Sequence, residues 1–275
     1  MENRRVLRRL TRLALLAVLL SGCDRRRGTE PAAASQPSTA REVRVAAASD
    51  LKFALDELSS AFRTRHPDVA VAPTYGSSGN FYTQLSNDAP FDLFLSADVA
   101  YPQKLAEQGK AAGGPLFRYA VGRIVVWVPN GSELDVEKRG MQALADATVK
   151  KIAIANPKHA PYGRAAEAAM RGAGVYERVK DRLVLGENVA QAAQFVRSGS
   201  ADVGVVALSL AVSPAMRGQG RYWEVPPDAY PRIEQGGVVL KWAKDPGAAD
   251  AFRQFMLSDE GRAILKTYGF VAPPE

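Results

Sequence analysis

The chain has 275 residues, of which 47% are hydrophobic and 24% charged, which is ordinary for a globular protein with one large domain or two small ones. The formal net charge of +7 is concentrated in residues 1–41, where nine arginines stand against three acidic residues, and the remaining residues are close to neutral. A nucleic-acid-binding protein needs a basic stripe on its folded body, so this charge distribution excludes that class.

Residues 1–23 have the pattern of an export signal. Five arginines precede an apolar run at residues 13–20, and Ser21, Gly22 and Cys23 follow it. The run is too short to span a bilayer, and this order of regions predicts a secretory signal peptide. The letters "LSGC" also resemble a bacterial lipobox, so Cys23 is the predicted lipidation site; an incidental cysteine after a plain signal is the alternative. Cys23 is the only cysteine, which excludes an intramolecular disulfide.

Residues 24–41 are rich in proline, alanine, serine and threonine and have no hydrophobic period. This composition predicts a disordered tether between the anchor and the folded body. The protein is therefore expected on the periplasmic side of the cell envelope, attached to the membrane through Cys23.

The body of the chain alternates short apolar runs with segments of helical periodicity. The predicted elements, in chain order, are strand 43–48, helix 51–66, strand 69–75, helix 81–86, strand 91–96, helix 101–108, strand 120–128, strand 151–155, helix 164–171, strand 183–185, helix 189–198, strand 203–207, strand 236–241 and helices 248–257 and 260–268. This alternation predicts an α/β fold with mainly parallel sheets.

Ligands of such sheets bind beyond the carboxyl ends of the strands, where the next helices begin. Four of these junctions are alike: residues 47–50, 76–79, 157–163 and 186–189. Each offers a small or flexible backbone and free amides at a helix start, which favour an anion without a cationic side chain. Each junction taken alone also fits a plain helix cap or turn, and spacing does not show that the four converge.

Six stretches in this order resemble the periplasmic molybdate-binding proteins of ABC transporters. They are "VAAASDLKFALDEL", "YGSSGNFYTQL", "APFDLFLSAD", "AIANPKHAPYGRAAEAAM", "ADVGVVALS" and "GRAILKTYGFVAPP". The resemblance covers about residues 43–273 and implies a type II periplasmic binding protein with two α/β lobes and the ligand in the cleft. Lobe 1 is expected at residues 42–121 plus 236–275 and lobe 2 at residues 122–235. The chain is expected to cross between them at residues 117–128 and 232–237.

The resemblance also implies the ligand and its contacts. The ligand would be molybdate or tungstate, a tetrahedral dianion held by hydroxyl groups and backbone amides. Ser49 and Ser78 correspond to the serine ligands, and Tyr162 and Val189 to residues that contribute amides. Asp50 is counted with the ligand-binding residues. The metal would arrive only as the oxyanion bound by Ser49, Ser78, Tyr162 and Val189, and no cofactor is expected.

Two departures from the family pattern bear on the site. Ala207 stands where some members have a ligand-binding tyrosine, so either the phenol of Tyr162 compensates or only its amide contacts the ligand. Asp50 stands where some relatives have asparagine or an apolar residue. We expect its side chain to cap the helix with the carboxylate turned aside. A carboxylate facing the pocket would instead repel a bare dianion and accept a hydrogen bond from a protonated anion such as hydrogen phosphate.

The predicted function is that of a monomeric binding component of an ABC importer, which closes over the anion and delivers it to a membrane permease. Another anion, such as sulfate, phosphate or an organic acid, is the alternative within this class. An enzyme is a weaker alternative, because His66 and His159 are far apart in sequence and no catalytic or metal-ligand motif is present. A ligand-sensing regulatory domain is also possible in this fold, but the export signal opposes a cytosolic DNA-binding partner.

Overall fold

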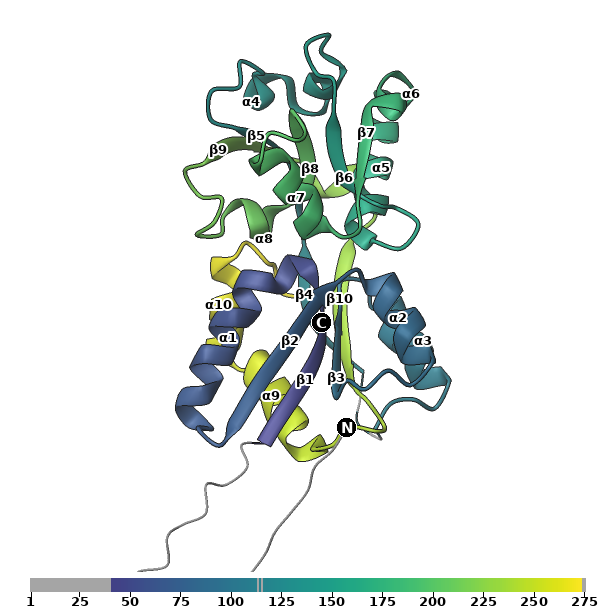
Figure 1. Ribbon diagram of the computed structural model, residues 1–275, viewed down its shortest axis with the longest axis vertical. Coiled ribbons are helices and arrows are strands. Elements are labelled where there is room, and N and C mark those ends of the chain that lie inside the picture. Colours follow the sequence, from purple (N-terminus) through teal and green to yellow (C-terminus); the bar gives the residue numbers. More distant parts are fainter. Residues whose placement is uncertain (1–40, 113, 115, 274–275) are drawn as a thin grey trace, which may run out of the picture. The chain divides into compact units, whose positions relative to one another are not determined.

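The computed structural model describes residues 41–112, 114 and 116–273. The predicted signal peptide, Cys23 and all of the predicted tether but its last residue lie outside this part of the chain. The described body contains two five-stranded sheets, each the centre of one lobe (Figure 1). No helix in the described residues has the length and hydrophobicity needed to cross a membrane.

The sheet of lobe 1 has the strand order β2-β1-β3-β10-β4. Its strands are β1 (Arg41–Ala48), β2 (Val69–Gly76), β3 (Leu93–Ser96), β4 (Phe117–Gly122) and β10 (Ile233–Val239). The first three run parallel, whereas β10 is antiparallel to both of its neighbours. The helices of this lobe are η1 (Ser49–Leu51), α1 (Lys52–Arg65), α2 (Ser78–Ser86), α3 (Ala100–Glu107), α9 (Pro246–Leu257) and α10 (Asp259–Thr267).

The central strand β1 explains why helices cover both faces of this sheet. Val43, Val45 and Ala47 pack into a core with α1, α9 and α10, while Ala46 between them faces a second core with α2 and α3. Successive side chains of a strand point to opposite faces, so a strand that is apolar at both parities must be covered on both sides.

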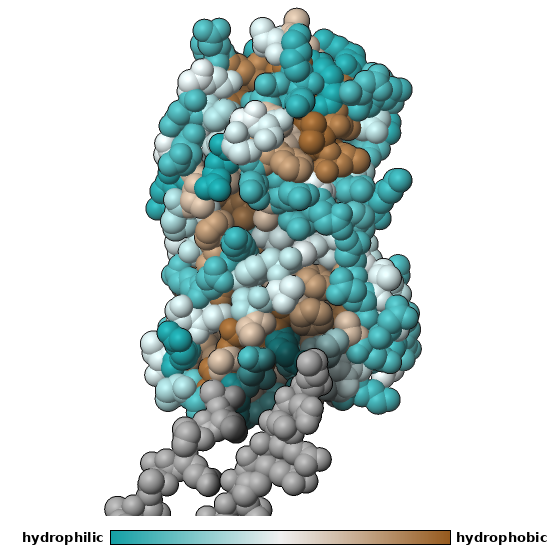
Figure 2. Space-filling model, in the orientation of Figure 1, coloured by the Kyte–Doolittle hydropathy of each residue, from teal (hydrophilic) through white to brown (hydrophobic). Residues whose placement is uncertain are grey.

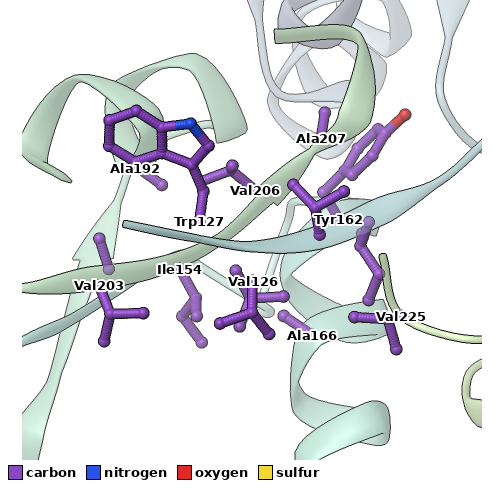
Figure 3. Close-up of a cluster of buried hydrophobic side chains, with 14 of the residues drawn as sticks. Val126, Trp127, Ile154, Tyr162, Ala166, Ala192, Val203, Val206, Ala207 and Val225 are labelled. Atoms are coloured by element: carbon purple, nitrogen blue, oxygen red, sulfur yellow. The ribbon is translucent and has the colours of Figure 1, made fainter. Parts of the chain in front are cut away.

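The sheet of lobe 2 has the order β7-β6-β8-β5-β9. Its strands are β5 (Ile124–Pro129), β6 (Ile152–Ala155), β7 (Leu183–Gly186), β8 (Val203–Ala207) and β9 (Gly220–Glu224). Its helices are α4 (Val136–Arg139), η2 (Gly140–Ala145), α5 (Pro161–Gly172), α6 (Tyr176–Val179), η3 (Lys180–Arg182), α7 (Val189–Arg197) and α8 (Leu208–Ala211), with η4 (Pro227–Ala229) on the way back to lobe 1. Trp127, Ile154 and Val203 lie in the buried cluster at its centre (Figure 3).

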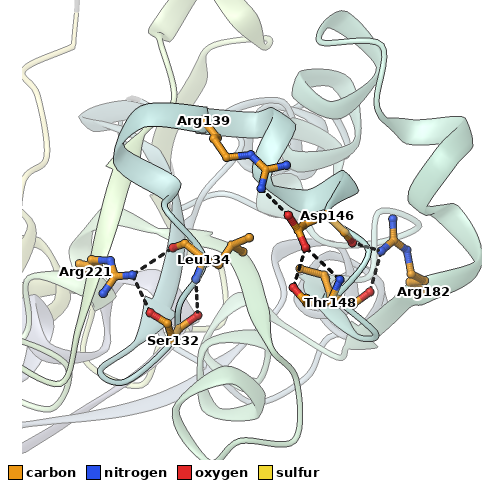
Figure 4. A network of polar contacts seen from close by, with 8 residues as sticks. Ser132, Leu134, Arg139, Asp146, Thr148, Arg182 and Arg221 are labelled. Atoms are coloured by element: carbon orange, nitrogen blue, oxygen red, sulfur yellow. Dashed lines mark hydrogen bonds and ion pairs between the residues drawn. The ribbon is translucent and has the colours of Figure 1, made fainter.

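Polar contacts hold the connections at the outer part of lobe 2 (Figure 4). The carboxylate of Asp146 pairs with Arg139 and accepts hydrogen bonds from the backbone N–H and the hydroxyl of Thr148, at 2.9 and 2.6 Å. These donors hold the pKa of Asp146 well below its usual range. Arg182 binds the carbonyl of the same residue at 2.9 Å. The connections are thus fixed by local charge and hydrogen bonding on an exposed side of the lobe.

The structure corrects the predicted elements at the passages between the lobes. The single strand predicted at 120–128 is two strands in different sheets: β4 ends at Gly122 and β5 begins at Ile124. On the way back, Ile233 of β10 pairs with Gly122, so the first sheet resumes three residues before the predicted return at 236. The sheets are also mixed instead of mainly parallel, because β5, β9 and β10 pair antiparallel with their neighbours. The periodicity had not indicated β9 or the short helices.

On the face drawn in Figure 2, the described surface is largely hydrophilic, with smaller hydrophobic patches between the hydrophilic residues. Among the described residues, the exposed large hydrophobic side chains are Leu185, Tyr222 and Val271. They come from β7, β9 and the end of the chain and are scattered singly, which is normal for a globular protein.

Candidate functional site

A small pocket lies between the two lobes, at the ends of the strands where helices begin. It is lined by Ala48, Ser49, Asp50, Gly76, Ser77, Ser78, Ala97, Ala160, Pro161, Tyr162, Asn188 and Val189. All four junctions singled out in the sequence contribute to this wall. The five residues predicted to bind the ligand therefore meet around one pocket, although their contact with a ligand stays a prediction.

Four helix starts surround the pocket, and three of them contribute free backbone N–H groups. The helices η1, α2, α5 and α7 begin at Ser49, Ser78, Pro161 and Val189. Within the described part of the chain, the N–H groups of Ser78, Tyr162 and Val189 have no hydrogen-bond acceptor. Such groups, at the positive end of a helix dipole, form a ready site for an anion.

Glycine permits the close approach of these helices to their strands. A Cβ atom on Gly163 would lie 2.1 Å from the carbonyl oxygen of Ala155, at the end of β6. No side chain fits there, so α5 can begin directly against the sheet only with glycine at this position. The Pro-x-Gly sequence around Tyr162 thus sets where its amide lies.

Two buried serine hydroxyls add side-chain donors to the amides. The Ser78 hydroxyl accepts a hydrogen bond from the N–H of Ala97 at 2.9 Å, and the Ser49 hydroxyl accepts one from the N–H of Ala190 at 3.3 Å. A hydroxyl that accepts through its oxygen still has its own hydrogen to donate. Because the backbone N–H groups fix both oxygens, each serine can offer that hydrogen to a ligand in the pocket.

The residues that line the pocket include no lysine, arginine or histidine. His159 lies just behind the wall, where its Nδ1 is 2.9 Å from the Ser77 hydroxyl oxygen and its Nε2 is 3.8 Å from Glu187. The ring of His159, which belongs to lobe 2, thus contacts Ser77 of lobe 1. No group of three or more histidine, cysteine or acidic side chains among the described residues is placed to hold a metal ion. The site thus offers neutral donors.

The expected role of Asp50 as a helix cap is wrong. Its carboxylate makes no capping hydrogen bond at η1 or α1. Instead, its Oδ2 accepts hydrogen bonds from the Tyr162 hydroxyl at 2.9 Å and from Gln235 Nε2 at 2.6 Å, while Oδ1 is buried without a partner. Burial raises the pKa of Asp50 to about 6, and the hydrogen bonds from Gln235 and Tyr162 oppose this rise.

The phenol of Tyr162 has a hydrogen-bond partner within the protein. Its hydroxyl donates to Asp50, and burial next to that carboxylate raises the pKa of Tyr162 well above its usual value. Tyr162 and Ala207 lie at the same end of the hydrophobic cluster (Figure 3). The phenol is therefore occupied by Asp50, and the residue's amide is its free donor.

The sequence analysis did not identify several residues that hold the pocket residues in place. Gln235 binds Asp50 from β10, and the Ser209 hydroxyl donates to the carbonyl oxygen of Asp50 at 2.8 Å. The N–H of Gly79 donates to the carbonyl oxygen of His159 at 2.9 Å, between the lobes. A polar glutamine next to two glycines in an apolar strand was the one available signal, because buried polar side chains need partners.

Comparison with known proteins identifies the family and the fold of the chain. Residues 43–271 match the family model described as bacterial extracellular solute-binding protein. The molybdate-binding protein ModA of Rhodobacter capsulatus is 38% identical over 235 residues, covering 86% of this chain and 90% of that protein. The protein of the same name from Azotobacter vinelandii is 37% identical over 231 residues, covering 84% and 90%.

The solved structures agree with the sequence comparison. The periplasmic molybdate-binding protein of Azotobacter vinelandii superimposes with a TM-score of 0.78 at 34% identity, covering 84% of this chain and 100% of that one. The sulfate-binding protein SubI of Mycobacterium tuberculosis, at 18% identity and a TM-score of 0.68, covers 84% and 87% and shares the fold. The two-lobed α/β architecture predicted from the sequence is confirmed. The chain belongs to the bacterial extracellular solute-binding proteins.

Proposed function

We propose that this protein is the solute-binding component of an ABC importer and that it binds molybdate, and with it tungstate, between its two lobes for delivery to a membrane permease. The observation that carries the proposal is the pocket in which free helix-start amides meet the hydroxyls of Ser49 and Ser78 without a cation. Relatives with 37% and 38% identity are named molybdate-binding proteins.

The chemistry of these donors agrees with the proposed ligand. Molybdate and tungstate are fully deprotonated at neutral pH, so they accept hydrogen bonds and donate none. The free N–H and O–H groups of the pocket wall match such an anion, because they can only donate where it can only accept. We propose that the lobes close over it as a hinge, because hydrogen bonds act more strongly once water has left.

The named relatives are binding proteins, and the protein is accordingly a binding protein and not an enzyme. Other oxyanions remain the competing ligands. Sulfate differs from molybdate in size, whereas hydrogen phosphate differs in carrying a proton. The unpartnered Oδ1 of Asp50 is an acceptor that such a proton could use, so phosphate tests the assignment most sharply.

The ligand is best tested by native mass spectrometry of residues 24–275 with equimolar molybdate, tungstate, sulfate and phosphate. We expect a single adduct of molybdate or tungstate on each chain, followed by calorimetry of the anions that bind. A chain that takes up only sulfate or phosphate would reassign the ligand, and a chain that takes up none would end the proposal.

Ser78→Ala should weaken molybdate binding by about 1–3 kcal/mol, roughly 5- to 150-fold, because a donor to a charged acceptor is lost. Calorimetry measures the change in dissociation constant. Ser60→Ala is the matched control, since the Ser60 hydroxyl donates to a backbone carbonyl on an exposed part of α1. Equal affinities of Ser78→Ala and the wild type would remove Ser78 from the site.

The family assignment places the protein outside the cytoplasmic membrane. We further propose that it is a monomer without a cofactor and that lipid on Cys23 anchors it to the membrane. Cys23→Ala should then move the protein from the membrane fraction to the soluble periplasmic fraction in cell fractionation. An unchanged membrane fraction would show that Cys23 is not the anchor.

A further inference from the structure

The described residues include two buried acidic side chains, and their surroundings differ. Both carboxylate oxygens of Asp92 accept hydrogen bonds from the guanidinium of Arg44 at 3.1 Å. The backbone N–H of Lys244 also donates to Asp92, at 2.8 Å, and all three residues belong to lobe 1. Asp50 is equally buried but receives no cation. Its carboxylate is held by a phenol and an amide, and the phenol comes from the other lobe.

The three side chains involved lie at the passage between the lobes. Asp50 belongs to lobe 1, Tyr162 to α5 of lobe 2, and Gln235 to β10, the strand by which the chain returns to lobe 1. Besides its bond to Asp50, Gln235 Nε2 lies 3.1 Å from the Tyr162 hydroxyl oxygen. A Cβ on Gly122, the last residue of β4 before the crossing, would lie 2.1 Å from that oxygen. The tip of Tyr162 therefore reaches out of its own lobe and against the crossing strand, where only glycine leaves room.

We propose that Asp50, Tyr162 and Gln235 form an interlobe latch, in which the Tyr162 hydroxyl binds Asp50 only when the lobes are together and so stabilises the closed form without touching the anion. The inference rests on the proposed function in one respect, that closure accompanies binding. In a hinged protein, a contact found only in the closed form raises the apparent affinity for any ligand that selects this form. The latch is therefore a positioning device that sets affinity and leaves selectivity to the pocket.

Two features separate a latch from a direct ligand contact. The phenol already donates its single hydrogen to Asp50, so it has none left for an oxyanion. The Tyr162 amide, by contrast, has no acceptor and belongs to the pocket wall. Tyr162→Phe thus removes the latch and keeps the amide, and it should weaken every bound anion by the same factor.

The test is a double-mutant cycle in which anion affinity is measured with the chain that lacks the predicted signal peptide. Tyr162→Phe should raise the dissociation constants of molybdate and tungstate about tenfold each, as expected for a lost buried hydrogen bond, and should cause no further loss in an Asp50→Ala background. Tyr119→Phe is the matched control, because the Tyr119 hydroxyl is buried but donates to the Ser96 carbonyl within lobe 1 at 3.0 Å. It should leave affinity unchanged.

Three results would overturn the latch: wild-type affinity in Tyr162→Phe, the same loss in the Asp50→Ala background, or a loss that differs strongly between the anions. The last result would make the phenol a ligand contact. If the wild-type protein binds no oxyanion, the proposed function fails. The same four proteins are then compared by their free energies of unfolding without ligand. Coupling between the changes at Tyr162 and Asp50 would support the latch, and additive effects would overturn it.

Discussion

Gly79→Ala is expected to reduce anion affinity about 100-fold or more while leaving the free energy of unfolding of the ligand-free protein unchanged or slightly higher. A Cβ at this position would lie 2.6 Å from the carbonyl oxygen and 3.0 Å from the Cα of His159. These are backbone atoms of the other lobe, so the lobes must separate to admit it. Separation withdraws the amides of Tyr162 and Val189 from an anion bound to lobe 1. Two donors to a charged acceptor are together worth about 3 kcal/mol or more.

The stability of the separated protein should not suffer, because Gly79 lies within α2 and alanine favours a helix by about 1 kcal/mol over glycine. Calorimetry with molybdate and urea unfolding without ligand measure the two effects. Gly247→Ala is the matched control in α9, where the nearest atom to the new Cβ is a side-chain oxygen of Asp245 at 3.6 Å. A Gly79→Ala protein that binds as tightly as the Gly247→Ala protein would show that contact between the lobes is not needed.

Asp50→Asn is expected to tighten molybdate binding by about tenfold or more at pH 7.5 and to flatten its pH dependence. Burial disfavours the charged form of Asp50 and raises the pKa of this carboxyl from its ordinary value of about 3.9 to about 6. The closed protein therefore binds a proton more readily than a protein in which this carboxyl is exposed. Closure is favoured most below about pH 4, and this advantage is lost as the pH rises through 6. By linkage, the free energy of closure becomes less favourable by about 3 kcal/mol across this pH range. A bound dianion increases this loss, because it also disfavours the ionised carboxylate.

Asparagine cannot ionise and still offers an oxygen to Tyr162, so it resembles the protonated acid. Dissociation constants from pH 5 to 8 should rise for the wild type and stay level for Asp50→Asn. The titratable side chains nearest Asp50 are the buried Tyr162 and Tyr119, and neither pKa falls in this range. Asp181→Asn, at an exposed position, controls for net charge.

A second group, His159, lies behind the pocket wall, where its Nδ1 is 2.9 Å from the Ser77 hydroxyl oxygen. We therefore include His159→Gln alone and together with Asp50→Asn. A pH dependence that survives Asp50→Asn and disappears in His159→Gln would contradict the assignment to Asp50.

The alternation of strands and helices could be predicted from the sequence because it follows from local patterns. A strand such as β1 is apolar at both parities, and α1 repeats its apolar residues at helical spacing, so each element shows its burial in its own residues. The four junctions could be predicted on the same ground, since glycines, serines and a Pro-x-Gly turn mark helix starts. Their assignment to an anion site came from resemblance, and the pocket that joins them came from the structure.

Other features depended on contacts between distant residues. Residues 120–128 look like one apolar strand, but the chain changes sheets at Arg123, and strand partners decide that change. Asp50 was assigned to a cap by a local rule, whereas its partners Tyr162 and Gln235 are 112 and 185 positions away.

The sequence alone was sufficient for the α/β class, the order of most elements and the polar character of the site, because backbone preference and hydrophobic periodicity act over a few residues. Two helix starts at the site were predicted wrongly, since α2 begins at Ser78 and α5 at Pro161, each three residues before the predicted start. The convergence of the junctions, the burial of Asp50 and the fit of Gly79 against His159 required the folded chain. Burial and steric contact depend on which distant segments are packed together, and no local pattern contains that information.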